Sequence, residues 1–150
     1  MVIHKTLNEI FSTYSNIAVT RELRYTTNGF TGREIAKRAG LSAPAALKAL
    51  THLESLKIVN RRIGGRDHIF TLNFSNYYVE QVLLPALEAE SRYFEKIKSE
   101  LKKHLSKDSE SVILFGSVAR NDETIKSDFD ICVVYKNQKN RNILENILSG

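Results

Sequence analysis

The residues with the clearest chemical potential are two aspartates near the end of the sequence. Asp128 and Asp130 flank Phe129, directly before an apolar run, 131–135, that predicts a strand. Successive strand residues point to opposite faces, so both carboxylates are expected on one side, about 7 Å apart at Cα. Carboxylates this close repel each other unless a cation lies between them. Oxygen ligands of this kind suit Mg²⁺, which takes its remaining ligands from water and phosphates.

A second group, upstream of the aspartates, has the features of a phosphate site. The apolar run 112–115 predicts a short buried strand, and Gly116-Ser117 ends it. Gly116 leaves room for a close approach, and Ser117 adds a hydroxyl at the expected start of a helix, where unpaired N–H groups favour an anion. Arg120 follows one turn later, within reach of a phosphate. The two groups together predict a site for Mg²⁺ and a nucleoside triphosphate.

These residues carry a resemblance to a known family. Gly116-Ser117, followed after ten residues by Asp128-Phe-Asp130, resembles the pattern of the minimal nucleotidyltransferases of the polymerase-beta superfamily, and Gly116-Ser-Val-Ala-Arg120 matches the common extended form of its first part. The resemblance covers about 108–150. It implies that Asp128 and Asp130 are catalytic and bind metal, and that Gly116, Ser117 and Arg120 bind the nucleotide. The alternative is an ordinary strand–turn–strand whose loop carries capping acids.

One departure from that family concerns a third carboxylate, which its members place on a later strand. After Tyr135 this sequence continues with a polar loop, 136–142, and a helix-like pattern, 143–148. Glu145 is the only acid there, and it falls in the helical pattern. The resemblance therefore implies an incomplete catalytic set, and it leaves open whether the chain is an enzyme.

The positive charge of the chain is confined to its first half. The net charge is +5, but residues 1–75 hold 11 Lys/Arg against 5 Asp/Glu, whereas residues 76–150 hold 11 against 12. A basic excess restricted to one half indicates a surface for a polyanion.

That basic half has a regular order of predicted elements. Amphipathic patterns cover 4–14 and 16–25, and a capping box, Thr31-x-x-Glu34, predicts a helix that ends at Gly40. Ser42 caps a further helix with Pro44 in its first turn. Two predicted strands, 58–63 and 66–72, are joined by a Gly64-Gly65 loop.

Helix, short turn, helix and hairpin is the order of a helix-turn-helix with a wing. The run from Arg33 to Ser42, with the apolar spacing of Ala46, Leu50 and Leu53, resembles winged-helix regulators of the MarR/ArsR type. The resemblance spans about 4–72 and implies binding to double-stranded DNA. A small helical domain that only packs against a partner is the alternative.

A recognition helix places its N-terminal and outward residues in the major groove, and the wing contacts the backbone. Lys48 alone could donate to guanine, and alanines offer contact mainly with thymine methyls. Without Arg or Asn for bidentate base reading, phosphate contacts should supply most of the affinity. The predicted DNA-binding residues are Ser42, Ala45, Lys48, Thr51, Arg61, Arg62 and Arg66.

A long helical pattern connects the two parts. Ser75 is its expected cap, apolar residues recur at three- and four-residue steps as far as Leu105, and Pro85 is expected to break it or to start a second helix. Its apolar stripe is explained equally by packing on both domains and by a homodimer. The expected organisation is a winged helix-turn-helix domain (1–75), a helical connector (76–107) and a partial nucleotidyltransferase-like domain (108–150), an α+β fold.

The amino-acid composition limits the class of protein and its cellular compartment. The 42% hydrophobic content and two prolines favour a globular chain, and no stretch approaches the ~20 apolar residues of a membrane span. Cys132, the single cysteine, lies in an apolar strand pattern and is expected to be a buried thiol in a reducing cytoplasm. We therefore expect a cytoplasmic protein without membrane contact.

Three functions remain open at this point. The first is a DNA-binding transcriptional regulator with a nucleotidyltransferase-like module that binds Mg²⁺ and nucleotide. The second is a nucleotidyltransferase whose winged helix serves docking or self-regulation. The third is an antitoxin with a toxin partner, since modules of this family also occur as antitoxins.

Overall fold

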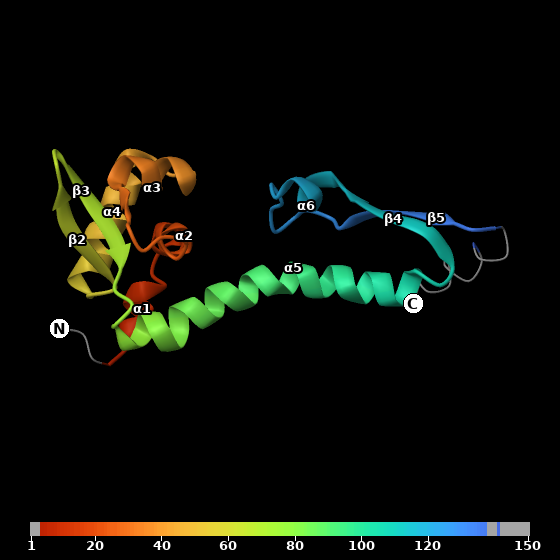
Figure 1. Ribbon diagram of the computed structural model, residues 1–150, viewed down its shortest axis with the longest axis horizontal. Helices are drawn as coiled ribbons and strands as arrows, with labels where there is room; N and C mark the ends of the chain where they lie inside the picture. Colours follow the sequence, from red (N-terminus) through yellow and green to blue (C-terminus); the bar gives the residue numbers. More distant parts are fainter. Residues whose placement is uncertain (1–3, 138–140, 142–150) are drawn as a thin grey trace. The chain divides into compact units, whose positions relative to one another are not determined.

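The computed structural model describes residues 4–137 and 141 (Figure 1). Contacts divide the chain into two compact units, Met1–Glu90 and Ser91–Gly150, here called unit 1 and unit 2. The division falls inside the predicted connector, whose first part belongs to unit 1 and whose remainder belongs to unit 2. Helices and strands are both present, as the α+β class requires.

Unit 1 has the element order of a winged helix-turn-helix, which confirms the sequence-based prediction. Three helices and a hairpin form one cluster in Figure 1, with the short α1 beside them. The elements are α1 (Thr6–Ile10), α2 (Tyr14–Leu23), β1 (Phe30–Thr31), α3 (Gly32–Arg38), α4 (Ala43–Ser55), β2 (Val59–Gly64) and β3 (Asp67–Leu72). The strands form an antiparallel sheet in the order β1-β3-β2.

The turn between α3 and α4 is fixed by local sequence signals. Thr31 and Glu34 form the predicted capping box at the start of α3. Gly40 adopts a φ of 63°, the left-handed conformation that ends a helix at low cost. The Ser42 hydroxyl then accepts a hydrogen bond from the Ala45 N–H at 3.3 Å and caps α4. These signals set the spacing of the two helices.

The wing loop lies one residue later than predicted. Gly64 pairs with Asp67 as the last rung of the hairpin, so the loop is Gly65-Arg66, not Gly64-Gly65. Gly65 supplies the positive φ, 68°. The shift follows from the register, since Val59 pairs with Leu72 in the core and each later pair is then fixed. Arg66 consequently occupies the tip of the wing.

The core of unit 1 is continuous. Side chains from the helices and both long strands are fully buried together, and the segment after β3 closes the cluster. The largest members are Ile10, Leu23, Ile35, Leu50, Leu53, Ile58, Phe70, Leu72 and Leu83.

The start of the long helix differs from the prediction at its cap and agrees with it at Pro85. Its cap is Asn76, whose Oδ1 accepts from the N–H groups of Tyr78 and Val79, and not Ser75. Of the two alternatives expected for Pro85, the start of a new helical segment is the one observed. A single π-helical turn (η1, Val79–Leu83) precedes α5 (Leu84–Leu105), so Pro85 falls in the first turn of α5, where a proline is tolerated.

Unit 2 contains the later part of α5 and a two-stranded ribbon. Strands β4 (Ser109–Phe115) and β5 (Asp130–Tyr135) pair antiparallel, and α6 (Gly116–Arg120) begins directly after β4. Cys132 is exposed, which contradicts the prediction of a buried thiol. It lies opposite Ile113 on a ribbon face that no described residue covers completely. The predicted helix 143–148 and Glu145 lie outside the described residues.

The helices were compared with the requirements of a membrane span. In the part of the chain that the structure describes, none has the length and apolar character that a transmembrane span requires.

Candidate functional site

The first candidate site is the outward face of α4. Ala46, Leu50 and Leu53 point into the core. The helical period then turns the remaining side chains outward, among them Lys48 and Thr51, both exposed. Ser42 is exposed at the start of the helix, whereas Ala45 is only half-exposed. Between Ser42 and Thr51 this face carries no acidic residue, so its charge there comes from Lys48. Glu54, one turn beyond Thr51, is paired with Arg61.

Leu47, like Ala43 and Pro44, lies on this face but was not among the predicted DNA-binding residues. Leu47 has 54% of its surface exposed. The signal was present in the sequence, because Leu47 stands four residues before Thr51 and four after Ala43, on the face opposite the buried stripe.

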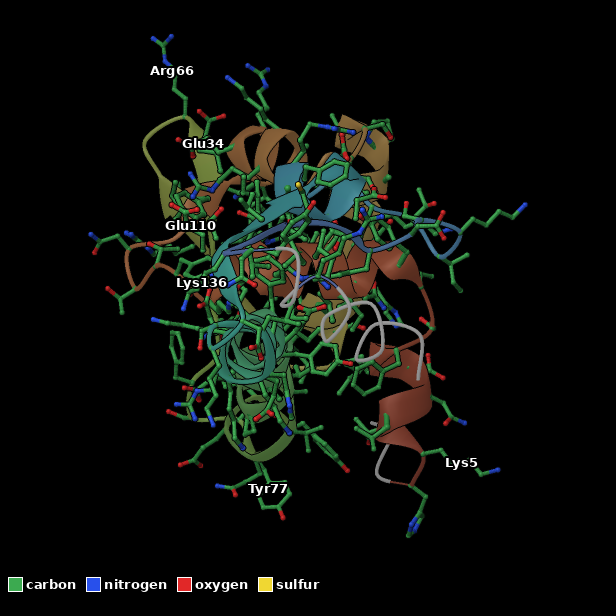
Figure 2. All side chains as sticks on the ribbon, turned by 90° about the vertical axis from the view of Figure 1, so that its right-hand side faces the viewer. Lys5, Glu34, Arg66, Tyr77, Glu110 and Lys136 are labelled. Atoms are coloured by element: carbon green, nitrogen blue, oxygen red, sulfur yellow. The ribbon has the colours of Figure 1, made fainter. Side chains whose placement is uncertain are left out.

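The three wing arginines differ in their surroundings. Arg61 forms an ion pair with Glu54 of α4, with Nε and Oε1 3.0 Å apart. The Arg62 guanidinium donates to the backbone carbonyl of Asn28 at 2.8 Å. The Arg66 side chain points outward from the tip of the wing (Figure 2), and it forms no hydrogen bond or ion pair with any described residue. Arg66 is therefore the wing cation that is free to meet a phosphate, while Arg61 and Arg62 also brace the wing.

A salt bridge joins α2 to the start of the long helix within unit 1. Arg21 Nη2 lies 2.8 Å from Glu90 Oε1, and Arg21 Nε donates to the other carboxylate oxygen at 2.9 Å. This bidentate bond lowers the pKa of Glu90 below its ordinary value and raises that of Arg21. The Thr31 backbone N–H likewise lowers the pKa of Glu34 in the capping box.

The second candidate site lies where β4 meets α6. Gly116 has a φ of 77°, and a side chain there would collide with Oδ2 of Asp130. Asp130 is the first residue of β5 and pairs with Phe115, which directly precedes Gly116. The structure thus brings the glycine and one of the aspartates together, and only glycine tolerates both the backbone conformation and the contact.

The other predicted residues of this site are less closely assembled. Asp128 is exposed in the loop before β5, so the two aspartates do not share a strand face as expected. The reason is that β4 ends at Phe115, the partner of Asp130, and no strand residue remains to pair with Asp128. Arg120 forms an ion pair with Asp122 at 3.0 Å, and Ser117 is half-buried in the first turn of α6.

The carboxylates limit which metal chemistry fits. No group of three or more His, Cys, Asp or Glu residues suited to a metal occurs among the described residues. Asp128 and Asp130 fit one Mg²⁺ that keeps water and phosphate ligands, because this hard ion needs few protein oxygens. Two carboxylates do not suffice for a pair of ions about 4 Å apart that share ligands.

Comparison with known proteins adds two observations. Residues 94–149 match the family model described as a nucleotidyltransferase domain. This matched segment includes the Gly116–Asp130 motif. No curated protein matches the chain.

Several solved structures are similar at low identity. A mutant of S. aureus MepR bound to an oligodeoxyribonucleotide is 19% identical, with 67% of this chain and 84% of that chain covered and a TM-score of 0.48. A mutant of Lactococcus lactis ZitR is 17% identical, with 73% and 66% covered and a TM-score of 0.44. The adhesin competence repressor AdcR from Streptococcus pyogenes is 14% identical, with 95% and 83% covered and a TM-score of 0.45.

The assignment of unit 1 rests on its own elements, the capped helix pair α3–α4 and the wing β2–β3. The assignment of unit 2 rests on the motif and on the family match. The chain thus joins a winged helix-turn-helix to a segment that matches the nucleotidyltransferase domain.

Proposed function

We propose that the chain is a DNA-binding transcriptional regulator whose unit 1 docks on duplex DNA. The observation that carries this proposal is the outward face of α4, which has no acid between Ser42 and Thr51, carries Lys48, and belongs to the same unit as the unpartnered Arg66 at the wing tip. The basic excess of residues 1–75 supports it.

The division of labour between helix and wing follows from the charges. Helix α4 is 13 residues long, so its N-terminus carries a partial positive charge toward the groove. Arg66 neutralises a phosphate beside the groove, and the exposed Arg33 and Lys37 of α3 are available for others. Binding of this kind releases counterions, so affinity falls steeply as salt rises.

The test is fluorescence anisotropy of a labelled duplex of mixed sequence, titrated with the full chain at 50 and 200 mM salt. Three or four phosphate contacts predict a slope of log K against log salt near −3, at about 0.9 per contact. The same titration at matched ionic strength with a non-nucleic polyanion such as heparin separates DNA docking from general anion binding. Binding to duplex that is absent or insensitive to salt would remove the proposal.

We further propose that the regulator is a homodimer. The apolar stripe of α5 continues into unit 2, where Tyr93, Ile97 and Leu101 line one open groove along the helix. Tyr93 is 65% exposed in the single chain. Two-fold pairing would cover this stripe and present two recognition helices to paired half-sites. A sedimenting species near 17 kDa at tens of micromolar would contradict the homodimer.

A second candidate function is nucleotidyl transfer, favoured by the family match and by the contact of Gly116 with Asp130. When bound, Mg²⁺ would neutralise the triphosphate. Asp128 and Asp130 would hold that ion, and Ser117 and Arg120 would contact phosphate oxygens. Among the described residues no third carboxylate groups with these two aspartates, so none is placed beside them to activate an attacking hydroxyl. We therefore propose that this chain binds Mg²⁺–nucleotide weakly and transfers nothing by itself.

The experiment for this second function is incubation with α-labelled ATP, CTP, GTP or UTP, scoring label on the protein. The matched variant is Asp128→Asn with Asp130→Asn, which should abolish nucleotide binding measured by equilibrium dialysis and leave DNA affinity unchanged or slightly higher. Label that appears with the native chain and disappears in the variant would establish the enzyme and overturn the proposal of a binding module.

A further inference from the structure

The outward face of α4 carries an unusual balance of side chains for a surface that meets DNA. Ala43, Pro44 and Leu47 form a continuous apolar strip, since positions three and four apart are neighbours on a helix. Leu47 is 54% exposed, and Thr51 adds its methyl group one turn further. Single exposed leucines are ordinary on protein surfaces, but this one adjoins Lys48 and Thr51 of the predicted recognition face.

The polar side chains of this face leave little capacity for hydrogen-bonded base reading. The Ser42 hydroxyl is engaged in capping α4 by the Ala45 N–H. Lys48 is a single point donor, and the outward face has no Arg, Asn or Gln for bidentate contacts to guanine or adenine. The chemistry available for sequence discrimination is therefore mainly apolar contact.

Duplex DNA offers one apolar group in the major groove that distinguishes its bases. Thymine carries a 5-methyl group, which adenine, guanine and cytosine lack. We propose that α4 reads thymine methyl groups, and that Leu47 is the specificity-determining residue that covers them. This inference rests on the proposed DNA-binding function.

Charge favours DNA over a protein as the occupant of the strip. Lys48 adjoins Leu47, the one acid of α4, Glu54, is paired with Arg61, and Arg33 and Lys37 of α3 are exposed in the same unit. An apolar protein surface docked on Leu47 would have to bury or neutralise Lys48. In the DNA groove the lysine stays near phosphates and its charge is compensated.

The expected size of the effect follows from the burial of one methyl group. Deleting one methyl group that is buried in the complex, away from water, weakens binding about fourfold. Two thymines contacted in one half-site, or one in each half-site of a dimer, give about fifteenfold, because well-separated contacts add in free energy.

The experiment replaces thymine by deoxyuracil, which removes the 5-methyl group and keeps base pairing unchanged. Duplexes are first selected from a randomised pool with the full-length native chain. The best binder is then synthesised with dT or with dU, and both are titrated by anisotropy at one salt concentration. The expected result is a four- to fifteenfold loss with dU in the native chain, and a loss below twofold in Leu47→Ala.

The control variant is Leu7→Ala, an exposed leucine on α1, which should keep the native dT/dU ratio. Equal affinity of the native chain for dT and dU duplexes, together with salt-dependent binding, would overturn the methyl readout and leave the DNA-binding proposal standing. A ratio that persists in Leu47→Ala would assign the readout to another residue. Failure of every duplex to bind would instead remove the proposed function itself.

Discussion

The two units of the chain differ in how completely they bury their own apolar side chains. In unit 1 the helices, both long strands and the segment after them share one core, with side chains such as Leu50 and Ile58 fully inaccessible. In unit 2, among the described residues, Leu105 is the only apolar side chain that is fully buried. Ile113 and Phe115, on one face of the ribbon, are 52% and 50% exposed.

Unit 1 is therefore held together by a closed core, whereas unit 2 is recognised by a local motif. A two-stranded ribbon is marginal by itself in water, so unit 2 depends on further packing against the apolar faces of β4 and β5. The spacing of Gly116 and Asp130 is nevertheless set locally, because the antiparallel register places Phe115 opposite Asp130. Motif geometry can therefore form where a closed core does not.

The largest expected difference concerns core truncation. Leu50→Ala in unit 1 should lower the free energy of unfolding by about 2–5 kcal/mol, since it leaves a cavity in a closed core. Ile113→Ala in unit 2 should change it by less than about 0.5 kcal/mol, because half of the side chain is already in contact with water. Urea titration of both full-length variants measures this contrast, and equal losses would show that the ribbon is as well packed as unit 1.

Each unit has a glycine with a positive φ, and the cost of replacing it with alanine should differ between the two units. Gly116→Ala combines a left-handed conformation with a collision against Asp130, whereas Gly65→Ala at the wing tip meets no atom within 4 Å. We expect Gly65→Ala to cost about 1–2 kcal/mol and Gly116→Ala to cost more and to accelerate amide exchange in β4 and β5. Amide hydrogen exchange checks this prediction, which fails if the ribbon amides of Gly116→Ala keep native protection.

The smallest effect is electrostatic and is confined to unit 1. The pKa of Glu90 is lowered by Arg21, so the pair stabilises the fold above the ordinary glutamate pKa of about 4.3 and loses this contribution as pH falls through the lower folded value. Glu90 is 52% exposed, so solvent screening limits the contribution to below about 1 kcal/mol.

The corresponding measurement compares Glu90→Gln with the native chain. The variant should have a lower urea midpoint at pH 7, and the gap should narrow as the pH falls below the ordinary glutamate pKa of about 4.3 and native Glu90 takes up a proton. Glu80→Gln, at an exposed glutamate in the π-helical turn before α5, serves as the control substitution. A gap that stays constant between pH 7 and pH 3 would contradict the linkage between Arg21 and Glu90.

Much of unit 1 could be predicted because its signals are local. The Thr31–Glu34 capping box, the Ser42 cap and the Gly40 stop each act within four residues, so sequence alone located α3 and α4. The wing loop was misplaced by one residue because Gly64 and Gly65 both permit a turn. The choice between them depends on the pairing of Val59 with Leu72 across the hairpin.

Unit 2 was harder to predict because its features depend on tertiary packing. Apolar neighbours suggested a buried Cys132, but burial requires a second layer on that ribbon face, and none of the described residues provides a complete one. Asp128 was expected on the strand, whereas the end of β4 at Phe115 leaves it in the loop.

The central claim is that unit 1 binds DNA through α4 and the wing. Its most direct test compares two variants, each of which loses two positive charges from one unit. Lys48→Ala with Arg66→Ala deletes two cations of unit 1, and Lys96→Ala with Lys103→Ala deletes two exposed cations of α5 in unit 2. Anisotropy titrations against one duplex at several salt concentrations should show at least tenfold weaker binding and a slope shallower by one to two units for the first variant, because each lost phosphate contact removes about 0.9. The second variant should bind within about twofold of the native chain. Equal losses in the two variants would mean that net charge alone attracts DNA, and would contradict the account.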